Sequence, residues 1–190
     1  MSRLRARRTI LVSSLGVLAL TVGGCAGHSA AAARKPAGER RALAAYLRQI
    51  EPLRLAVNRL LEGADPILSG NHDGTLSPAR ASLAMGRLER RFAGYTLAVN
   101  AIDAGTPQLR SLQATYAHTY ILEDSYLSAL TVGLGERELD GLPNTESEQR
   151  IAIIAWRTGV EVLARRLAYK LPADLQLAGR GEIRPSPDGS

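Results

Sequence analysis

One stretch of the chain constrains its fold more than any other, because its apolar residues recur at the spacing of a packed helix. The steps alternate between four and three residues along Ala81, Met85, Leu88, Phe92, Tyr95, Val99 and Ile102. A period of about 3.5 is typical of helices that pack at about 20° to one another. The pattern predicts a core-facing helix that starts at Ser77-Pro78, a favoured N-cap followed by a favoured first residue.

Three further segments carry apolar residues at helical spacing. The segment 40–62 contains Pro52, which we expect to kink or split it. A third helix is predicted from Thr106-Pro107, and a fourth from a Thr145–Glu148 capping box to a stop before Pro172. Each segment carries a stripe of apolar residues on one helix face. In the segment 40–62 the stripe is Leu43, Leu47, Ile50, Val57 and Leu61; in the third helix it is Leu109, Leu112, Tyr116, Tyr120, Leu127, Leu130 and Leu134; in the fourth it is Ile153, Trp156, Val160, Leu163 and Leu167.

The connections between these helices are short. They cover residues 63–76, a break near Gly105 and residues 135–144, so each joins neighbours that run antiparallel. We therefore predict an all-α fold, an antiparallel up-down-up-down four-helix bundle, over residues 39–172. Aromatic residues make up only 4% of the chain, which disfavours strands. Residues 173–190 are rich in Gly, Pro and polar groups and are predicted to form a loose tail.

The first 25 residues are organised like an export signal. Residues 1–8 are polar and positive, residues 9–22 are apolar, and two glycines then precede Cys25. A positive end, a short apolar run and small residues at a cleavage site are typical of a cleaved signal peptide. The apolar run is too short for a membrane span, which needs about 20 residues.

This basic start dominates the net charge of the chain. Four arginines lie in the first eight residues, and the rest of the chain carries 20 basic and 18 acidic residues. The net charge therefore falls from +6 to +2 without the signal. This near balance disfavours nucleic acid as a partner.

The motif Val22-Gly23-Gly24-Cys25 resembles the lipobox of bacterial lipoproteins. The resemblance covers only about the first 25 residues. It implies that Cys25, the single cysteine of the chain, receives a diacylglyceryl group on its thiol. It also implies cleavage before Cys25, with Val22, Gly23 and Gly24 as determinants and residues 1–24 as the signal peptide. The mature chain would then be anchored by lipid on the extracytoplasmic face of the cell membrane.

Two alternatives concern the same segment. The N-terminus also fits an ordinary secretory signal with an accidental cysteine, and Arg7-Arg8 resembles a twin-arginine signal for export of folded proteins. Residues 25–38 are rich in small residues and are predicted to be the lipidated cysteine and a flexible tether. A coil of this length has a root-mean-square span of about 20 Å.

Patterns for catalysis or metal binding are weak. A di-iron bundle needs Glu-x-x-His motifs, which the chain lacks, and its histidines, His28, His72 and His118, are scattered. A calcium loop starting at Ser69 is imperfect because Ser69 and Arg80 stand where Asp and Glu are needed, so we interpret residues 69–76 as an interhelical turn. We predict no catalytic residue, no metal and no cofactor.

One polar feature interrupts the apolar stripes. Arg54 and Glu123 lie 14 and 16 residues into the first and third predicted helices, which run parallel in the bundle. Counting the antiparallel helices back from their ends places Arg91 and Arg157 near the same level. The residues predict either a mid-bundle ion pair that fixes the register or a polar pocket for a small ligand.

These observations predict a lipid-anchored envelope lipoprotein with a non-catalytic binding or scaffolding domain. The alternative is a small-molecule sensor or carrier that uses the polar layer, and an envelope enzyme is the third hypothesis. The predicted partners are the membrane, through lipid on Cys25, and an unidentified envelope protein or small ligand.

Overall fold

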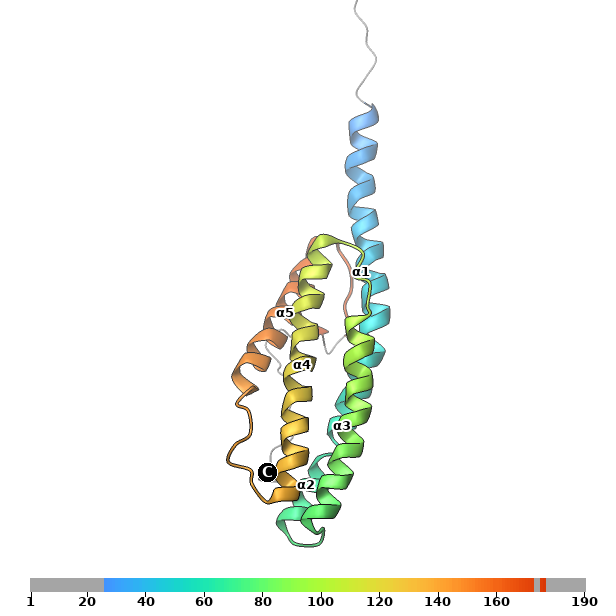
Figure 1. Ribbon diagram of the computed structural model, residues 1–190. Helices are drawn as coiled ribbons and strands as arrows, with labels where there is room; N and C mark the ends of the chain where they lie inside the picture. Colours follow the sequence, from blue (N-terminus) through green and yellow to red (C-terminus); the bar gives the residue numbers. More distant parts are fainter. Residues whose placement is uncertain (1–25, 173–174, 177–190) are drawn as a thin grey trace, which may run out of the picture.

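The computed structural model describes residues 26–172 and 175–176, and the side chains from residue 36 onward. Within these residues the secondary structure is helical, without strands (Figure 1). The prediction of an all-α fold is confirmed. The helices are α1 (Ala26–Leu61), α2 (Asp65–His72), α3 (Pro78–Asn100), α4 (Pro107–Glu136) and α5 (Glu146–Arg166).

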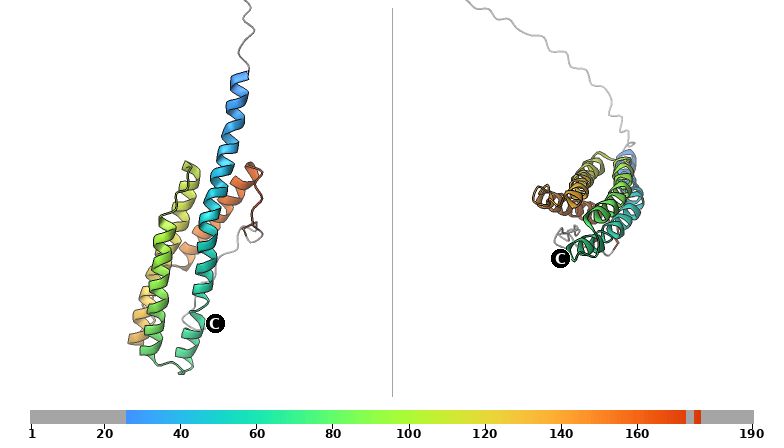
Figure 2. Two further views of the ribbon diagram at one scale, coloured as in Figure 1. Left: turned by 90° about the vertical axis from the view of Figure 1, so that its right-hand side faces the viewer. Right: turned by 60° about the horizontal axis from the view of Figure 1, so that its bottom comes forward.

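The four long helices form the predicted antiparallel bundle. In Figure 1, α1 and α4 run downward, whereas α3 and α5 run upward, and the side view in Figure 2 shows the same alternation for α1, α3 and α4. The most extensive packing joins α3 to α4, followed by α4 to α5 and then α1 to α3. The helix with the clearest sequence period therefore lies between two neighbours, which explains why so much of its surface is apolar.

Helix α1 starts earlier than the sequence predicted. It is continuous from Ala26 to Leu61, so the segment assigned to a flexible tether is helical, and its N-terminal part extends beyond the ends of the other helices (Figures 1 and 2). Four consecutive alanines, residues 30–33, account for the difference, since alanine has the highest helix propensity. Pro52 lies inside this helix and does not split it, contrary to one of the two expectations.

Helix α2 was not predicted, because residues 63–76 were interpreted as a connection only. Its sequence does carry start signals: Asp65 lies in the first turn, and Pro66 lies at the start of the helix, where it needs no amide hydrogen. Within this short helix, Leu68 and Gly70 are buried. It packs on α3 and closes the end of the bundle opposite to Ala26 (Figure 1).

The predicted helix starts at Ser77 and Thr106 are confirmed by capping bonds. The Ser77 hydroxyl accepts from the Arg80 amide at 3.4 Å, and the Thr106 hydroxyl accepts from the Leu109 amide at 3.2 Å. The capping box predicted at α5 is not formed by Glu148, whose carboxylate instead contacts His118 Nε2 on α4 at 2.9 Å. That contact links α4 to α5 at the surface.

The predicted stripes form the core. On α3, Ala81, Met85, Leu88, Phe92 and Val99 are buried, while Tyr95 is half-buried against them. Ile102, the last residue of the predicted stripe, lies just beyond the end of α3 and is also half-buried. The predicted face of α5 is buried at every position: Ile153, Trp156, Val160, Leu163 and Leu167. The same side chains that set the sequence period thus supply the apolar burial that stabilises the bundle.

Candidate functional site

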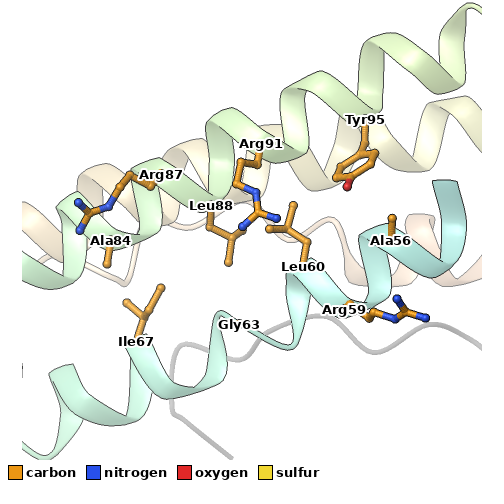
Figure 3. A pocket seen from close by; sticks show the side chains of 10 residues that line it. All are labelled: Ala56, Arg59, Leu60, Gly63, Ile67, Ala84, Arg87, Leu88, Arg91 and Tyr95. Carbon is orange, nitrogen blue, oxygen red and sulfur yellow. The ribbon is translucent and has the colours of Figure 1, made fainter. Parts of the chain in front are cut away.

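A surface groove of about 620 Å³ lies between α3 and the segment where α1 ends and α2 begins (Figure 3). It is partly open to solvent and is not an enclosed chamber. Its lining residues are Ala56, Arg59, Leu60, Gly63, Ile67, Ala84, Arg87, Leu88, Arg91 and Tyr95. We refer to these ten residues as the α1–α3 groove.

Helical spacing brings the α3 side of the groove together. Ala84, Arg87, Leu88, Arg91 and Tyr95 recur every three or four residues and therefore share one face of α3. Leu88 is buried and forms part of the floor, whereas the methyl of Ala84 leaves space above it. This face lies beside the core-facing stripe of α3. Because the core stripe packs against α4, the groove face is not covered by α4.

The far side of the groove is built by the end of α1 and by α2. Leu60 is buried and continues the apolar floor, and Ile67 is half-buried beside it. Gly63 lies two residues beyond the end of α1 and carries no side chain that would fill the space toward α3. Apolar and small residues thus line the bottom of the groove from both sides.

The charged groups of the groove are all positive. Arg59, Arg87 and Arg91 are exposed, and the lining includes no carboxylate. Among the residues described by the structure, none of these three arginines forms an ion pair with an acidic side chain. Figure 3 shows Arg91 reaching toward α1 in the middle of the groove, with Arg87 and Arg59 toward opposite ends. The arrangement favours binding of an anionic partner with an apolar surface.

The interior holds a second polar arrangement, a chain of hydrogen bonds that crosses the bundle. Trp156 Nε1 donates to the Tyr46 hydroxyl at 2.8 Å, and that hydroxyl donates to Gln113 Oε1 at 2.8 Å. Gln113 Nε2 then donates to the backbone carbonyl of Val99 at 2.6 Å. Each of the four long helices contributes one of these residues. Burial raises the pKa of the Tyr46 phenol, and the hydrogen bond from Trp156 lowers it by less.

Aromatic rings surround this chain. The rings of Tyr116 and Trp156 stack with centroids 4.1 Å apart, and Tyr116 meets Tyr120 edge-on at 5.3 Å. Phe92 on α3 stacks on Tyr120 at 5.6 Å. These contacts join α3, α4 and α5 in the centre of the bundle. The ring packing and the hydrogen-bond chain together fix the arrangement of the helices.

The predicted polar layer is only partly formed as expected. Arg54, Glu123 and Arg157 are buried, with exposures of 2%, 2% and 5%. Arg91, expected in the same layer, is instead exposed and lines the α1–α3 groove. Counting residues along a helix fixes the level of a side chain but not the direction in which it points. Arg91 lies next to the buried Phe92, one step of about 100° around the helix.

Two partners of this layer were not anticipated. Arg54 Nη2 forms an ion pair with Glu51 Oε1 at 2.8 Å, three residues earlier on the same helix. Glu123 Oε2 accepts a hydrogen bond from Gln149 Nε2 on α5 at 2.7 Å. The i, i+3 spacing of Glu51 and Arg54 was visible in the sequence, since such pairs are neighbours on a helix. Gln113, placed between Leu109 and Tyr116 in the stripe of α4, was a similar signal for the hydrogen-bond chain.

The residues predicted for anchoring lie outside the described part of the chain. These are Cys25 and the cleavage determinants Val22, Gly23 and Gly24. Most of the predicted tail, residues 173–190, also lies outside it. Between residues 26 and 176, no described helix is both long enough and apolar enough to cross a membrane. The same residues contain no group of three or more His, Cys, Asp or Glu side chains placed to hold a metal ion.

Comparison with known proteins finds no family model, curated protein or solved structure that matches the chain.

Proposed function

We propose that the protein is an envelope lipoprotein anchored through Cys25, and that its bundle is a non-catalytic binding domain whose site is the α1–α3 groove. The observation that supports this most directly is the continuity of α1. The helix runs without interruption from Ala26, the first residue that the structure describes, to Leu61, and carries Arg59 of the groove near its end. Lipid attachment and binding site would thus be connected by one helix.

The length of that helix sets the distance between the anchor and the groove. Arg59 lies 33 residues after Ala26 in α1, which corresponds to about 50 Å at 1.5 Å per residue. In Figure 1 the start of α1 and helix α2 lie at opposite ends of the molecule. A lipid on Cys25 would therefore hold the groove away from the headgroups, where an envelope partner has access to it.

Contacts at the point where α1 leaves the bundle support this geometry. Arg166 at the end of α5 donates to Glu39 Oε2 on α1 at 2.8 Å and to Gln108 Oε1 on α4 at 2.9 Å. One guanidinium thereby joins three helices beside the projecting part of α1. These contacts tie the base of the projecting segment to α4 and α5.

The chemistry of the groove suits recognition more than catalysis. Its ionisable groups are three arginines and Tyr95. An arginine guanidinium stays charged at physiological pH and does not exchange protons as a general acid or base. Its planar fork instead matches carboxylate and phosphate groups in a bidentate way.

A sensor or carrier that uses the interior is the second candidate. The burial of Arg54, Glu123 and Arg157 favours it, because buried charges are retained at some ligand sites. A specific ligand would raise the melting temperature by mass action. A thermal-shift screen in which a compound stabilises the native chain but not a Glu123→Gln variant would favour this candidate over the groove.

The anchor is tested by Cys25→Ser in the full chain. We expect the variant to lose lipid labelling and to leave the membrane fraction, because lipidation of the thiol is the proposed attachment. Fractionation after a high-salt wash measures it. Retention of the variant in washed membranes would contradict the anchor.

The binding role is tested by photo-crosslinking in intact cells. A photoreactive phenylalanine at the position of Tyr95 should form specific adducts, because this side chain lines the groove. The same residue at the position of Ile121 on α4 is the matched control, since Ile121 is 51% exposed and lies outside the lining. Equal adducts at both positions, or none at Tyr95, would contradict a binding site in the groove.

A further inference from the structure

The charges of the α1–α3 groove are spread along its length and not gathered at one point. Arg87 and Arg91 are one helical turn apart on α3, and Arg59 lies on the opposite side on α1. Figure 3 shows their guanidinium groups at the two ends and in the middle of the groove. A ligand with a single anionic head would engage one of these groups, whereas an extended ligand with several carboxylates would engage all of them.

The floor between these charges is apolar. Leu60 and Leu88 are buried at its base, and Ala56 and Ala84 leave room above them. The α3 side runs from Ala84 to Tyr95, a difference of 11 residues or about 16 Å. Three turns of a partner helix have the same length. Apolar residues at helical spacing on that helix would contact the floor of the groove, and the polar residues beside them would contact the arginines.

We propose that the α1–α3 groove binds an acidic amphipathic helix of a partner protein. This deepens the proposed binding function and rests on it. The groove arginines find no acidic partner among the described residues, and a helix with carboxylates beside its apolar face supplies them. Charge complementarity also steers association and excludes basic helices of equal hydrophobicity.

The openness of the groove favours a helix over a small amphiphile. Sites for small molecules enclose most of the ligand surface, about 70–90% of it. Here the three arginines are exposed, and the groove is partly open to solvent. A helix covers such a groove with its own backbone and flanking side chains, so it needs no enclosing walls.

The test uses the full-length chain in nanodiscs of neutral phosphatidylcholine and two fluorescent 15-residue helical peptides. Both peptides carry leucines at every third or fourth position, one with glutamates and the other with lysines beside them. We expect fluorescence anisotropy to show binding of the glutamate peptide at least about tenfold tighter than the lysine peptide. Binding of the glutamate peptide should weaken as salt rises, because exposed charges are screened.

Matched variants locate the interaction. The double variant Arg87→Glu and Arg91→Glu should raise the Kd of the glutamate peptide at least about tenfold, because both α3 charges that would contact the peptide are reversed. Arg110 is an exposed arginine of α4 outside the lining, so Arg110→Glu should leave the affinity for the glutamate peptide unchanged. Thermal melts of both variants check that the fold is intact, and the single variant Arg91→Glu replaces the double if that one does not fold.

Three results would overturn the proposal. The first is equal affinity for the two peptides or no measurable affinity for either, and the second is equal loss in the groove and Arg110 variants. The third is displacement of the glutamate peptide by dodecanoate at a tenfold lower concentration than that of the peptide, which would assign the groove to a small amphiphilic anion. If these occur while crosslinks at Tyr95 persist in cells, the binding function stands and only the acidic helix is wrong.

Discussion

Replacing Tyr46 with phenylalanine tests the hydrogen-bond chain that crosses the bundle. The Tyr46 side chain is fully buried, and its hydroxyl accepts from Trp156 Nε1 and donates to Gln113 Oε1, both at 2.8 Å. Phenylalanine keeps the ring and its packing but removes the hydroxyl. The indole N–H and the amide oxygen then lose their shared partner inside the bundle.

The magnitude follows from these two stranded groups. A buried polar group that loses its hydrogen bond costs about 1–3 kcal/mol, so the variant should lose about 2–4 kcal/mol of unfolding free energy after some relaxation. A domain of this size is stable by about 5–15 kcal/mol in total. At about 2–4 °C per kcal/mol, the melting temperature should fall by about 5–15 °C.

Urea unfolding followed by tryptophan fluorescence measures this loss directly. Trp156 is the single tryptophan of the chain and belongs to the hydrogen-bond chain, so it reports on the region that is changed. Tyr95→Phe is the matched control, because Tyr95 is only half-buried at the groove, and it should stay within about 0.5 kcal/mol. A loss below about 0.5 kcal/mol for Tyr46→Phe, or equal losses for the two variants, would refute the reasoning.

The same residue predicts a dependence on alkaline pH. Burial raises the pKa of Tyr46, so the folded state keeps its proton above about pH 10, where an unfolded tyrosine loses it. The resulting stabilisation is complete below about pH 10 and is lost as the pH rises further. Tyr46→Phe lacks this titration, so the difference in unfolding free energy between the native chain and the variant should narrow above about pH 10.

Three further predictions concern the core and its charges. Phe92→Ala should cost about 3–5 kcal/mol in urea unfolding because Phe92 is buried, whereas Leu97→Ala, at an exposed position, should stay within about 0.5 kcal/mol. Burial and the neighbouring Glu89 carboxylate raise the pKa of Asp124 above its ordinary 3.8, so the free energy of unfolding falls as the pH rises above that value. Asp124→Asn should therefore raise the melting temperature at pH 7 but not at pH 3, and an unchanged melting temperature at pH 7 would contradict this. A double-mutant cycle on Glu123→Gln and Arg54→Met should give a coupling of about 0.5–3 kcal/mol, because opposite buried charges at matching levels attract, and a coupling near zero would argue against an ion pair between them.

The fold class could be predicted from the sequence because helix periodicity is a local property. The alternating steps from Ala81 to Val99 depend only on which face of one helix is apolar, and the structure buries that face. The starts at Ser77 and Thr106 were equally local, since a capping side chain bonds to an amide three residues away. Short connections then left an antiparallel order as the natural arrangement.

The candidate site depended on the tertiary structure, because it is formed by residues from different helices. Periodicity assigned Arg54 and Glu123 to buried faces, whereas counting back along its helix placed Arg91 in the interior layer, although the Arg91 side chain is exposed. The groove exists only where α3 meets the end of α1, and no spacing along the chain reports the distance between two helices.

The sequence by itself therefore determined the helical segments, their core faces and their antiparallel order, together with the resemblance to a lipoprotein signal at Cys25. The tertiary structure decided which polar groups meet: Tyr46, Gln113 and Trp156 lie far apart in the chain but within hydrogen-bond distance in the bundle. It also decided that the arginines of α3 and α1 line one groove. The physical reason is that helix formation and capping act over three or four residues, whereas the rotation and contact of packed helices are set by side chains from all of them at once.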